Sequence, residues 1–116
     1  MLSTIISGVI KGIEGQKVNI ETCIGNGLPN FNIVGLASKS VIESRERIRS
    51  AIIHSGYDFP HGHITVNLSP ASLNKNGSHL DLPIAIGVLS STLVVNSMKA
   101  KAYAVIGELS LSGRIM

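Results

Sequence analysis

The stretch that decides the fold runs from residue 40 to residue 68 and reads SVIESRERIRSAIIHSGYDFPHGHITVNL. Small and apolar residues recur at helical spacing in its first half, which predicts a helix with one buried face. Gly56 fits the left-handed position that ends many helices, and Pro60 prevents the helix from resuming. The last six residues, HITVNL, alternate apolar and polar side chains, as a half-buried strand does.

The start of this helix carries a capping signal. We expect Ser40 to cap the helix, because Glu43 lies three residues later as the partner of a capping box. Glu43 and Arg47 are also four residues apart, in the order that favours an ion pair on an exposed face. The face expected to be buried comprises Val41, Ser44, Ile48, Ala51 or Ile52, and Ser55.

Three strands are predicted before the helix. Residues 5–10 are mostly β-branched and apolar, and residues 17–24 alternate apolar and polar side chains. Turn residues at 12–16 lie between them, so we expect a hairpin. A second break at 25–30 precedes a third strand at 31–36.

Further elements are predicted after residue 68. A polar connection at 69–79 leads to a second helix that Asp81 caps, with Pro83 in its first turn. This helix is apolar nearly all round and should be buried. A loop at 96–101 and strands at 102–106 and 109–116 complete the order β-β-β-α-β-α-β-β. We therefore expect an α+β two-layer sandwich, in which a mixed sheet carries two helices on one face.

Composition excludes several classes of protein. The 116 residues suit a single domain, and 44% hydrophobic residues with a mean hydropathy of +0.34 exclude a disordered chain. The longest apolar stretch, 82–95, is interrupted and too short to span a membrane, and the N-terminus lacks the features of a signal peptide. The single cysteine, Cys23, cannot form an internal disulfide, which favours a cytoplasmic location.

The basic residues give the first candidate site. The net charge is only +3, but Arg45, Arg47 and Arg49 fall within five residues of the helix. Each is turned by about 200° from the one before, so only Arg45 and Arg49 share a face. They could contact phosphates or the carboxylates of a neighbouring subunit. A solvated face paired with Glu43 and Glu46 is the simpler interpretation.

Motifs for nucleotide binding are absent. No GxxxxGK[ST] string occurs, and the GNG at 25–27 lacks the third glycine of GxGxxG, so we do not expect ATP hydrolysis by this chain alone. The aromatic residues are too few and scattered for a base-stacking platform; they are Phe31, Tyr57, Phe59 and Tyr103.

The histidines suggest two interpretations, of which a zinc site is the first. His61 and His63 form an HxH pair whose side chains point to the same face of a strand, and His54 and Asp58 could supply further ligands. Surface polar residues around a turn explain the same pattern, and we favour that interpretation.

Serine catalysis is the other enzymatic possibility. Ser69, Ser72 and Ser78 lie before the second helix, with Lys75 and His79 nearby as candidate bases. Such loops are commonly simple turns, and no GxSxG nucleophile elbow is present.

Three strings in the same order resemble the N-terminal domain of the magnesium-chelatase-related AAA+ ATPases, the ComM/YifB group. They are NGLPNFNIVGLASKSVIESRERIRSAI at 26–52, GYDFPHGHITVNLSPASLNKNGSHLDLPIAIGVL at 56–89 and IGELSLSGRI at 106–115. The similarity extends from about residue 5 to the last residue, and the predicted last strand reaches Met116 without a turn. We therefore expect 1–116 to be a single N-terminal domain, and a fragment of a longer protein.

The resemblance implies a cytoplasmic, hexameric ATPase whose ComM-like members are DNA helicases that promote branch migration in natural transformation. It implies a fold similar to the proteolytic domain of Lon and to the C-terminal domain of RadA. The ATPase module, with ATP and Mg, would follow this domain, so no cofactor is expected in this chain. The implied partners are that module, neighbouring subunits and DNA, with no membrane.

The comparison with Lon also bears on catalysis. The nucleophile's place falls on His79, or on Ser78 after a slip of one residue, and the place of the catalytic lysine falls beyond Met116. The dyad is incomplete, so the resemblance implies a non-catalytic accessory domain that assists DNA contact or hexamer assembly. We assign nucleic-acid contact to Arg45, Arg47, Arg49 and Lys75. The alternative is a Lon-like hydrolase of Ser-Lys or Ser-His type.

Overall fold

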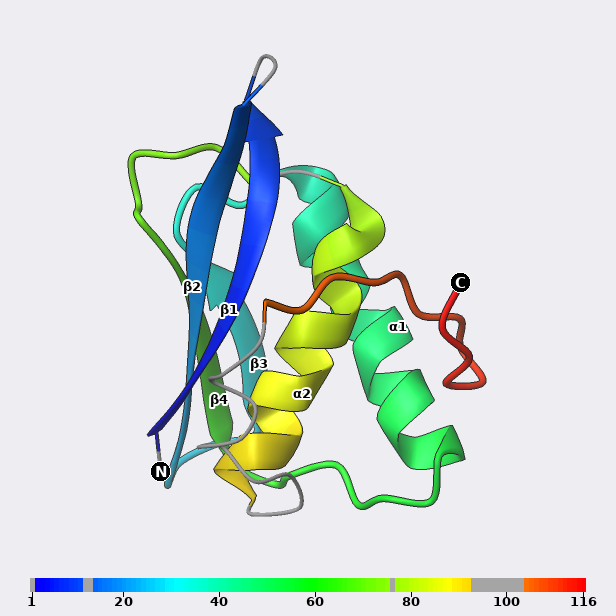
Figure 1. Cartoon of the computed structure of the whole chain (residues 1–116). Helices are drawn as coiled ribbons and strands as arrows, with labels where there is room; N and C mark the ends of the chain where they lie inside the picture. The colour runs from blue at the N-terminus through cyan, green and yellow to red at the C-terminus, as the bar shows by residue number, and fades with distance from the viewer. Residues whose placement is uncertain (1, 12–13, 76, 93–103) are drawn as a thin grey trace.

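A computed structural model describes residues 2–11, 14–75, 77–92 and 104–116. Four strands form one layer and two helices form the other, on a single face of the sheet (Figure 1). The strands are β1 (Leu2–Lys11), β2 (Glu14–Gly25), β3 (Asn30–Val34) and β4 (His63–Ser69). The helices are α1 (Lys39–His54) and α2 (Asp81–Ser91), with the short 3-10 turn η1 (Ser78–Leu80) directly before α2. The α+β class and the two helices on one face are confirmed.

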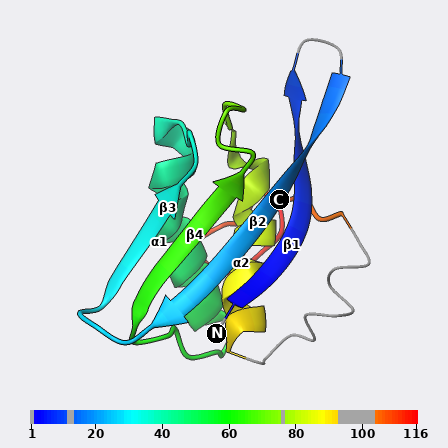
Figure 2. The same cartoon turned by 90° about the vertical axis from the view of Figure 1, so that its left-hand side faces the viewer.

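The sheet is mixed, as predicted, with the strand order β1-β2-β4-β3. β1 and β2 form the expected antiparallel hairpin, β2 and β4 are antiparallel, and β3 and β4 are parallel (Figure 2). Parallel neighbours need a crossover connection, and α1 supplies it between β3 and β4. This crossover places α1 beside the β3 edge of the sheet.

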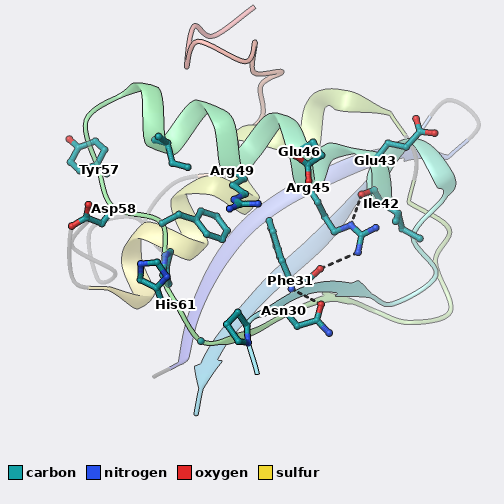
Figure 3. Close-up of a pocket in the computed structure, with 15 residues that line it drawn as sticks. Asn30, Phe31, Ile42, Glu43, Arg45, Glu46, Arg49, Tyr57, Asp58 and His61 are labelled. Atoms are coloured by element: carbon teal, nitrogen blue, oxygen red, sulfur yellow. Dashed lines mark hydrogen bonds between the residues drawn. The ribbon is translucent and has the colours of Figure 1, made fainter. Parts of the chain in front are cut away.

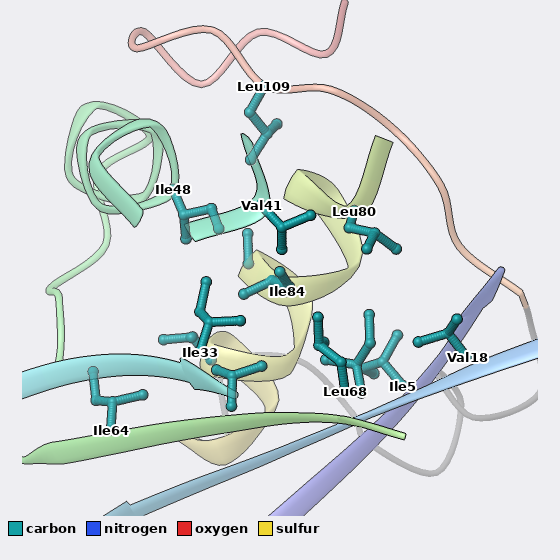
Figure 4. Packing of buried hydrophobic residues seen from close by; sticks show 14 of the residues in the cluster. Ile5, Val18, Ile33, Val41, Ile48, Ile64, Leu68, Leu80, Ile84 and Leu109 are labelled. Atoms are coloured by element: carbon teal, nitrogen blue, oxygen red, sulfur yellow. The ribbon is translucent and has the colours of Figure 1, made fainter. Parts of the chain in front are cut away.

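The core lies between the sheet and the helices (Figure 4). Strand residues of alternate positions point into it, which is why period-two patterns predicted β2 and β4 correctly. The α1 residues that we expected to be buried are buried except Ser55, which lies beyond the last helical residue and is exposed. The most deeply buried apolar side chains are Ile5, Val18, Ile20, Val41, Ile48, Ile64, Val66, Leu68, Leu80, Ile84 and Val88.

Helix α2 packs very closely on β1 and β2. A Cβ atom on Gly87 would lie 2.6 Å from the Thr22 hydroxyl oxygen, so only glycine permits this approach. The Ser3 hydroxyl donates to the Gly87 carbonyl at 2.8 Å, and the Ser91 hydroxyl donates to it at 3.0 Å. Most of the helix is buried, as its all-round apolar sequence predicted.

Both predicted helix caps are wrong. Helix α1 begins at Lys39 after Ser38, and no side chain of the described residues caps it. Ser40 therefore lies inside the helix, where its hydroxyl instead accepts a hydrogen bond from the Gly77 backbone N–H at 3.1 Å. Asp81 is the first residue of α2, and its carboxylate bonds to groups outside the helix. In both places the side chain that we expected to cap the helix bonds instead to a residue distant in the sequence.

The two predicted C-terminal strands are also wrong for the part that the structure describes. Residues 104–106 make only an isolated bridge between Ala104 and Ile6, and residues 109–116 make only one between Leu109 and Ile115. The segment leaves the β1 edge because Gly107 bonds to η1 and to the start of α2. Its N–H donates to the His79 carbonyl at 2.8 Å, and its carbonyl accepts the Leu82 N–H at 2.9 Å. The predicted loop at 96–101 and residues 102–103 lie outside the described residues.

None of the helices among the described residues combines the length and apolarity needed to cross a bilayer.

Candidate functional site

A groove of about 790 Å³ opens between α1, the start of β3 and the segment 57–62 (Figure 3). The fold creates it because Gly56 turns the chain back after α1 with φ of +90°, so that 57–62 returns beside the helix. Its lining residues are Pro29, Asn30, Phe31, Ile42, Glu43, Arg45, Glu46, Arg49, Ile53, Tyr57, Asp58, Phe59, Pro60, His61 and Gly62.

Arg45 is held in a fixed position in this groove. Its Nε–H donates to the Ile42 carbonyl at 3.1 Å, and its Nη1 donates to the Phe31 carbonyl at 3.2 Å (Figure 3). A guanidinium has five N–H donors, so three remain for a ligand. The Phe31 N–H is also occupied, since it donates to the Asn30 side-chain oxygen at 2.8 Å.

Arg49 lies one helical turn further along α1. Its Cζ is 5.9 Å from the centroid of the Phe59 ring, within the range of a cation–π contact. The Phe59 and Phe31 rings pack with centroids 5.6 Å apart. Over the described residues, the ion pairs are Lys39–Glu43 and Arg47–Asp81, so no carboxylate lies within 4.0 Å of either groove arginine.

Three carboxylates surround the two guanidiniums. Glu43, Glu46 and Asp58 all line the groove, and all three residues are exposed. The groove therefore presents charges of both signs, with a slight excess of negative charge when every group is ionised. Such a surface is less suited to a polyanion than to a partner that also carries both signs.

Arg47 does not belong to the groove. Its Nε donates to Asp81 Oδ2 at 2.8 Å and its Nη2 donates to Oδ1 at 3.0 Å, while the Leu109 N–H also donates to Oδ2 at 3.2 Å. The hydrogen bond to Asp81 raises the pKa of Arg47, and the negative charges of Asp81, Glu108 and Glu43 act in the same direction. Asp81 is fully buried. Its bonds to Arg47 and to the Leu109 N–H join α1, α2 and the C-terminal segment.

Lys75 is fully buried and, unlike the groove arginines, binds groups inside its own chain. Its Nζ donates to the Gly35 carbonyl at 2.5 Å and to the Pro70 carbonyl, and burial lowers its pKa. The Lys75 backbone also connects the loop after β4, to which it belongs, with the loop after β3, since its N–H donates to the Leu36 carbonyl at 3.1 Å. In this conformation Lys75 has no surface for a phosphate.

The four residues assigned to nucleic acid thus occupy three places, and only Arg45 and Arg49 share a surface. Nucleic-acid contact stays a prediction for that pair.

The candidate catalytic residues have other partners. The Ser78 hydroxyl donates to the Glu108 carboxylate at 2.6 Å. The His79 Nε2 bonds to the Gly8 carbonyl at 2.8 Å, and since a carbonyl only accepts, we assign the proton to Nε2. Among the described residues, none of Ser69, Ser72 and Ser78 is hydrogen-bonded to Lys75 or His79.

The candidate zinc ligands are dispersed. His61 and Asp58 line the groove, and His54 donates from Nδ1 to the Ser50 carbonyl at 2.8 Å on α1. His63 is exposed at the first residue of β4. Within the described parts of the chain, no three His, Cys, Asp or Glu residues are grouped as metal ligands would be.

The family described as "Subunit ChlI of Mg-chelatase" matches residues 20–116. The chain belongs to this family. The chain is 45% identical to "Uncharacterized protein YifB" of Salmonella typhimurium over 104 residues, which are 90% of this chain and 21% of that protein. It is 41% identical to YifB of Escherichia coli and 39% identical to "Competence protein ComM" of Haemophilus influenzae, each over 98% of this chain and 22% of the relative. The resemblance to the ComM/YifB group is confirmed, and the chain spans about a fifth of the length of these relatives.

Some contacts of these residues could be predicted from sequence patterns and others could not. The shared face of Arg45 and Arg49 followed from their spacing of four residues. The contact between Phe31 and Phe59 did not, because it depends on the return of the chain after Gly56. No local signal marked Asp81 as the partner of Arg47, which is 34 residues away.

Proposed function

We propose that this chain is a non-catalytic accessory domain of a longer, cytoplasmic AAA+ ATPase related to magnesium chelatase and similar to ComM. The domain contacts the ATPase module and neighbouring subunits, and so assists assembly of a hexamer. The ATPase module binds ATP and Mg, and the longer protein is a DNA helicase for branch migration in natural transformation. Membership of the ChlI family and the extra length of the YifB and ComM relatives support this proposal.

The observation that carries the non-catalytic role is the bonding of Ser78, His79 and Lys75. The serine donates to a carboxylate, the histidine Nε2 bonds to a carbonyl, and the lysine is buried between two carbonyls. A Ser-Lys or Ser-His dyad needs a lysine or histidine nitrogen that accepts the serine proton, and a nitrogen that is already bonded elsewhere does not serve. A Lon-like hydrolase would therefore require a different arrangement of all three residues.

DNA contact through the groove is the second candidate. The two groove arginines, which have no carboxylate partner in the described part of the chain, favour it, because guanidiniums bind phosphates well. The three surrounding carboxylates oppose it, since each repels a phosphate backbone. Contact with another protein surface accounts for both sets of charges, and for this reason we prefer it.

The test uses the longer protein with a specific protease site placed after residue 116. After purification and cleavage, size-exclusion chromatography with light scattering shows whether the two fragments stay together, and ATP hydrolysis is measured for each. We expect co-elution, with ATP hydrolysis confined to the fragment that lacks residues 1–116. Separation of the fragments, or ATP hydrolysis by residues 1–116, would contradict the proposal.

A further inference from the structure

The groove arginines form a binding site for a carboxylate, with N–H donors that are already held in position. Two backbone carbonyls fix Arg45, and Arg49 lies four residues later on the same face of α1. Neither has a carboxylate partner among the described residues. Guanidinium donors match the two oxygens of a carboxylate, so one acidic side chain entering the groove would find partners already in place.

An apolar wall lies next to these donors. Ile53 and Tyr57 remain exposed at 48% and 45%, and the half-buried rings of Phe59 and Phe31 continue the wall into the groove. Exposed apolar side chains grouped beside unpaired charges are typical of a surface that binds another protein. The occupant should therefore carry a bulky apolar side chain next to its acidic one.

Strand addition is excluded at the mouth of the groove. β3 is an edge strand, but at Phe31 its N–H is bonded to the Asn30 side chain and its carbonyl to Arg45. The backbone of an incoming strand would find no partner at this residue. Recognition must instead use side chains.

The same chain displays a segment with the required chemistry. Ile106 is 65% exposed, and Glu108, two residues later in an extended stretch, is also exposed. The Glu108 Oε1 accepts the Ser78 hydroxyl, and no hydrogen bond to its Oε2 is formed among the described residues. The segment folds back so that the backbone of Arg114 lies opposite that of Ser110, since the Ser110 N–H donates to the Arg114 carbonyl at 2.9 Å and the Met116 N–H donates to the Glu108 carbonyl at 2.8 Å. Ile106, Glu108 and Arg114 together offer an apolar group, a carboxylate and a guanidinium. The groove offers an apolar wall, two guanidiniums and three carboxylates.

A chain cannot fill its own groove with this segment. Leu109 is bonded to Asp81, the partner of Arg47, and the adjacent Glu108 accepts the hydroxyl of Ser78 in η1. Arg47 is turned by about 200° from Arg45 and Arg49, so Glu108 lies on the other side of α1 from the groove. The occupant has to come from another copy.

We propose that the groove receives residues 106–114 of a second copy of the chain. Glu108 of that copy pairs with Arg45 and Arg49, Ile106 packs against Ile53 and Tyr57, and Arg114 faces the groove carboxylates. Each copy keeps one open groove and one open segment, so copies add head to tail. This inference rests on the proposed function, because it specifies the contact through which neighbouring subunits assemble.

A charge exchange tests the contact by sedimentation equilibrium, with chain concentrations up to about 1 mM. The variants are Arg49→Glu and Glu108→Arg, and amide NMR spectra check that each remains folded. The wild-type chain should self-associate, and each variant alone should associate at least tenfold more weakly because like charges meet. An equimolar mixture should regain wild-type association, since every contact between the two variants joins opposite charges. Lys17→Gln, which changes an exposed lysine outside the groove, should behave like the wild type.

Three results would overturn the proposal. They are a wild-type chain that stays monomeric at the highest concentration, variants that associate as strongly as the wild type, and a mixture that does not recover. A single-stranded oligodeoxynucleotide that shifts the groove amides in a chain that does not self-associate would identify nucleic acid as the occupant instead. These results concern contacts between copies of residues 1–116, whereas the cleavage experiment concerns contact with the ATPase module, so the two proposals can fail separately.

Discussion

Arg47 on α1 and Asp81 on α2 form a two-bond ion pair, with N–O distances of 2.8 and 3.0 Å. The carboxylate is fully buried, and it also accepts the Leu109 N–H. One side chain therefore holds the two helices and the C-terminal segment together. The pair also removes Arg47 from the basic surface that the sequence suggested, and leaves Arg45 and Arg49 as the groove arginines.

Replacing Arg47 by Gln should lower the free energy of unfolding by about 3 kcal/mol, because the Asp81 carboxylate would stay buried without its partner. Urea unfolding followed by circular dichroism measures this change. The matched control is Lys39→Gln, which breaks the exposed Lys39–Glu43 pair at 3.9 Å and should cost less than about 0.5 kcal/mol. Equal effects of the two substitutions would show that the Arg47–Asp81 pair contributes no more than a surface pair.

Lys75 gives a prediction about pH. Burial lowers its pKa in the folded chain below the ordinary value of 10.5, so on raising the pH the folded state releases this proton before the unfolded state does. In that interval the unfolded state binds more protons, and stability therefore rises with pH until the unfolded lysine also titrates. The free energy of unfolding of the wild type relative to Lys75→Met should accordingly increase from neutral pH towards 10.5.

Urea unfolding of the wild type and of Lys75→Met at a series of pH values measures this difference. A difference between the wild type and Lys75→Met that stays level or falls with pH would contradict the desolvation of the Lys75 ammonium.

Gly35→Ala should destabilise the fold by more than about 2 kcal/mol, because the residue has φ of +103° and a Cβ would lie 2.1 Å from the Leu68 carbonyl oxygen. Gly25→Ala serves as the control, since its Cβ would meet nothing within 4 Å, and it should change stability by less than about 0.5 kcal/mol. Thermal unfolding of both variants measures the difference. A Gly35→Ala chain as stable as the control would show that the loop after β3 can move away from β4.

The elements that sequence patterns predicted well are those with a regular period. Alternation identified β2 and β4, a β-branched apolar run identified β1, and helical spacing identified the buried face of α1. The C-terminal strands were wrong because their apolar residues resemble strand sequence, whereas Gly107 and Leu109 find hydrogen-bond partners on α2 and η1 and not along a sheet edge. Tertiary contacts overrode the local pattern there.

Site residues were predictable only where local geometry places them. The common face of Arg45 and Arg49 is a property of any helix. The burial of Lys75 could not be read from its polar neighbours, because its acceptors belong to Gly35 and Pro70 in loops that the strands bring together. The partner of Arg47 was assigned to Glu43 by helical spacing, yet Asp81 takes its place with two hydrogen bonds.

The most direct test of the central claim, that this domain has no active centre of its own, is labelling of the folded chain with a serine-directed fluorophosphonate, followed by intact-mass spectrometry. A known serine hydrolase labelled in parallel checks the reagent, and Ser78→Ala is the matched variant. The account predicts no adduct on the wild-type chain, because Ser78 donates to the Glu108 carboxylate, whereas the Lys75 and His79 nitrogens that a Ser-Lys or Ser-His dyad would need bond to backbone carbonyls. A stoichiometric adduct on the wild type that disappears in Ser78→Ala would contradict it.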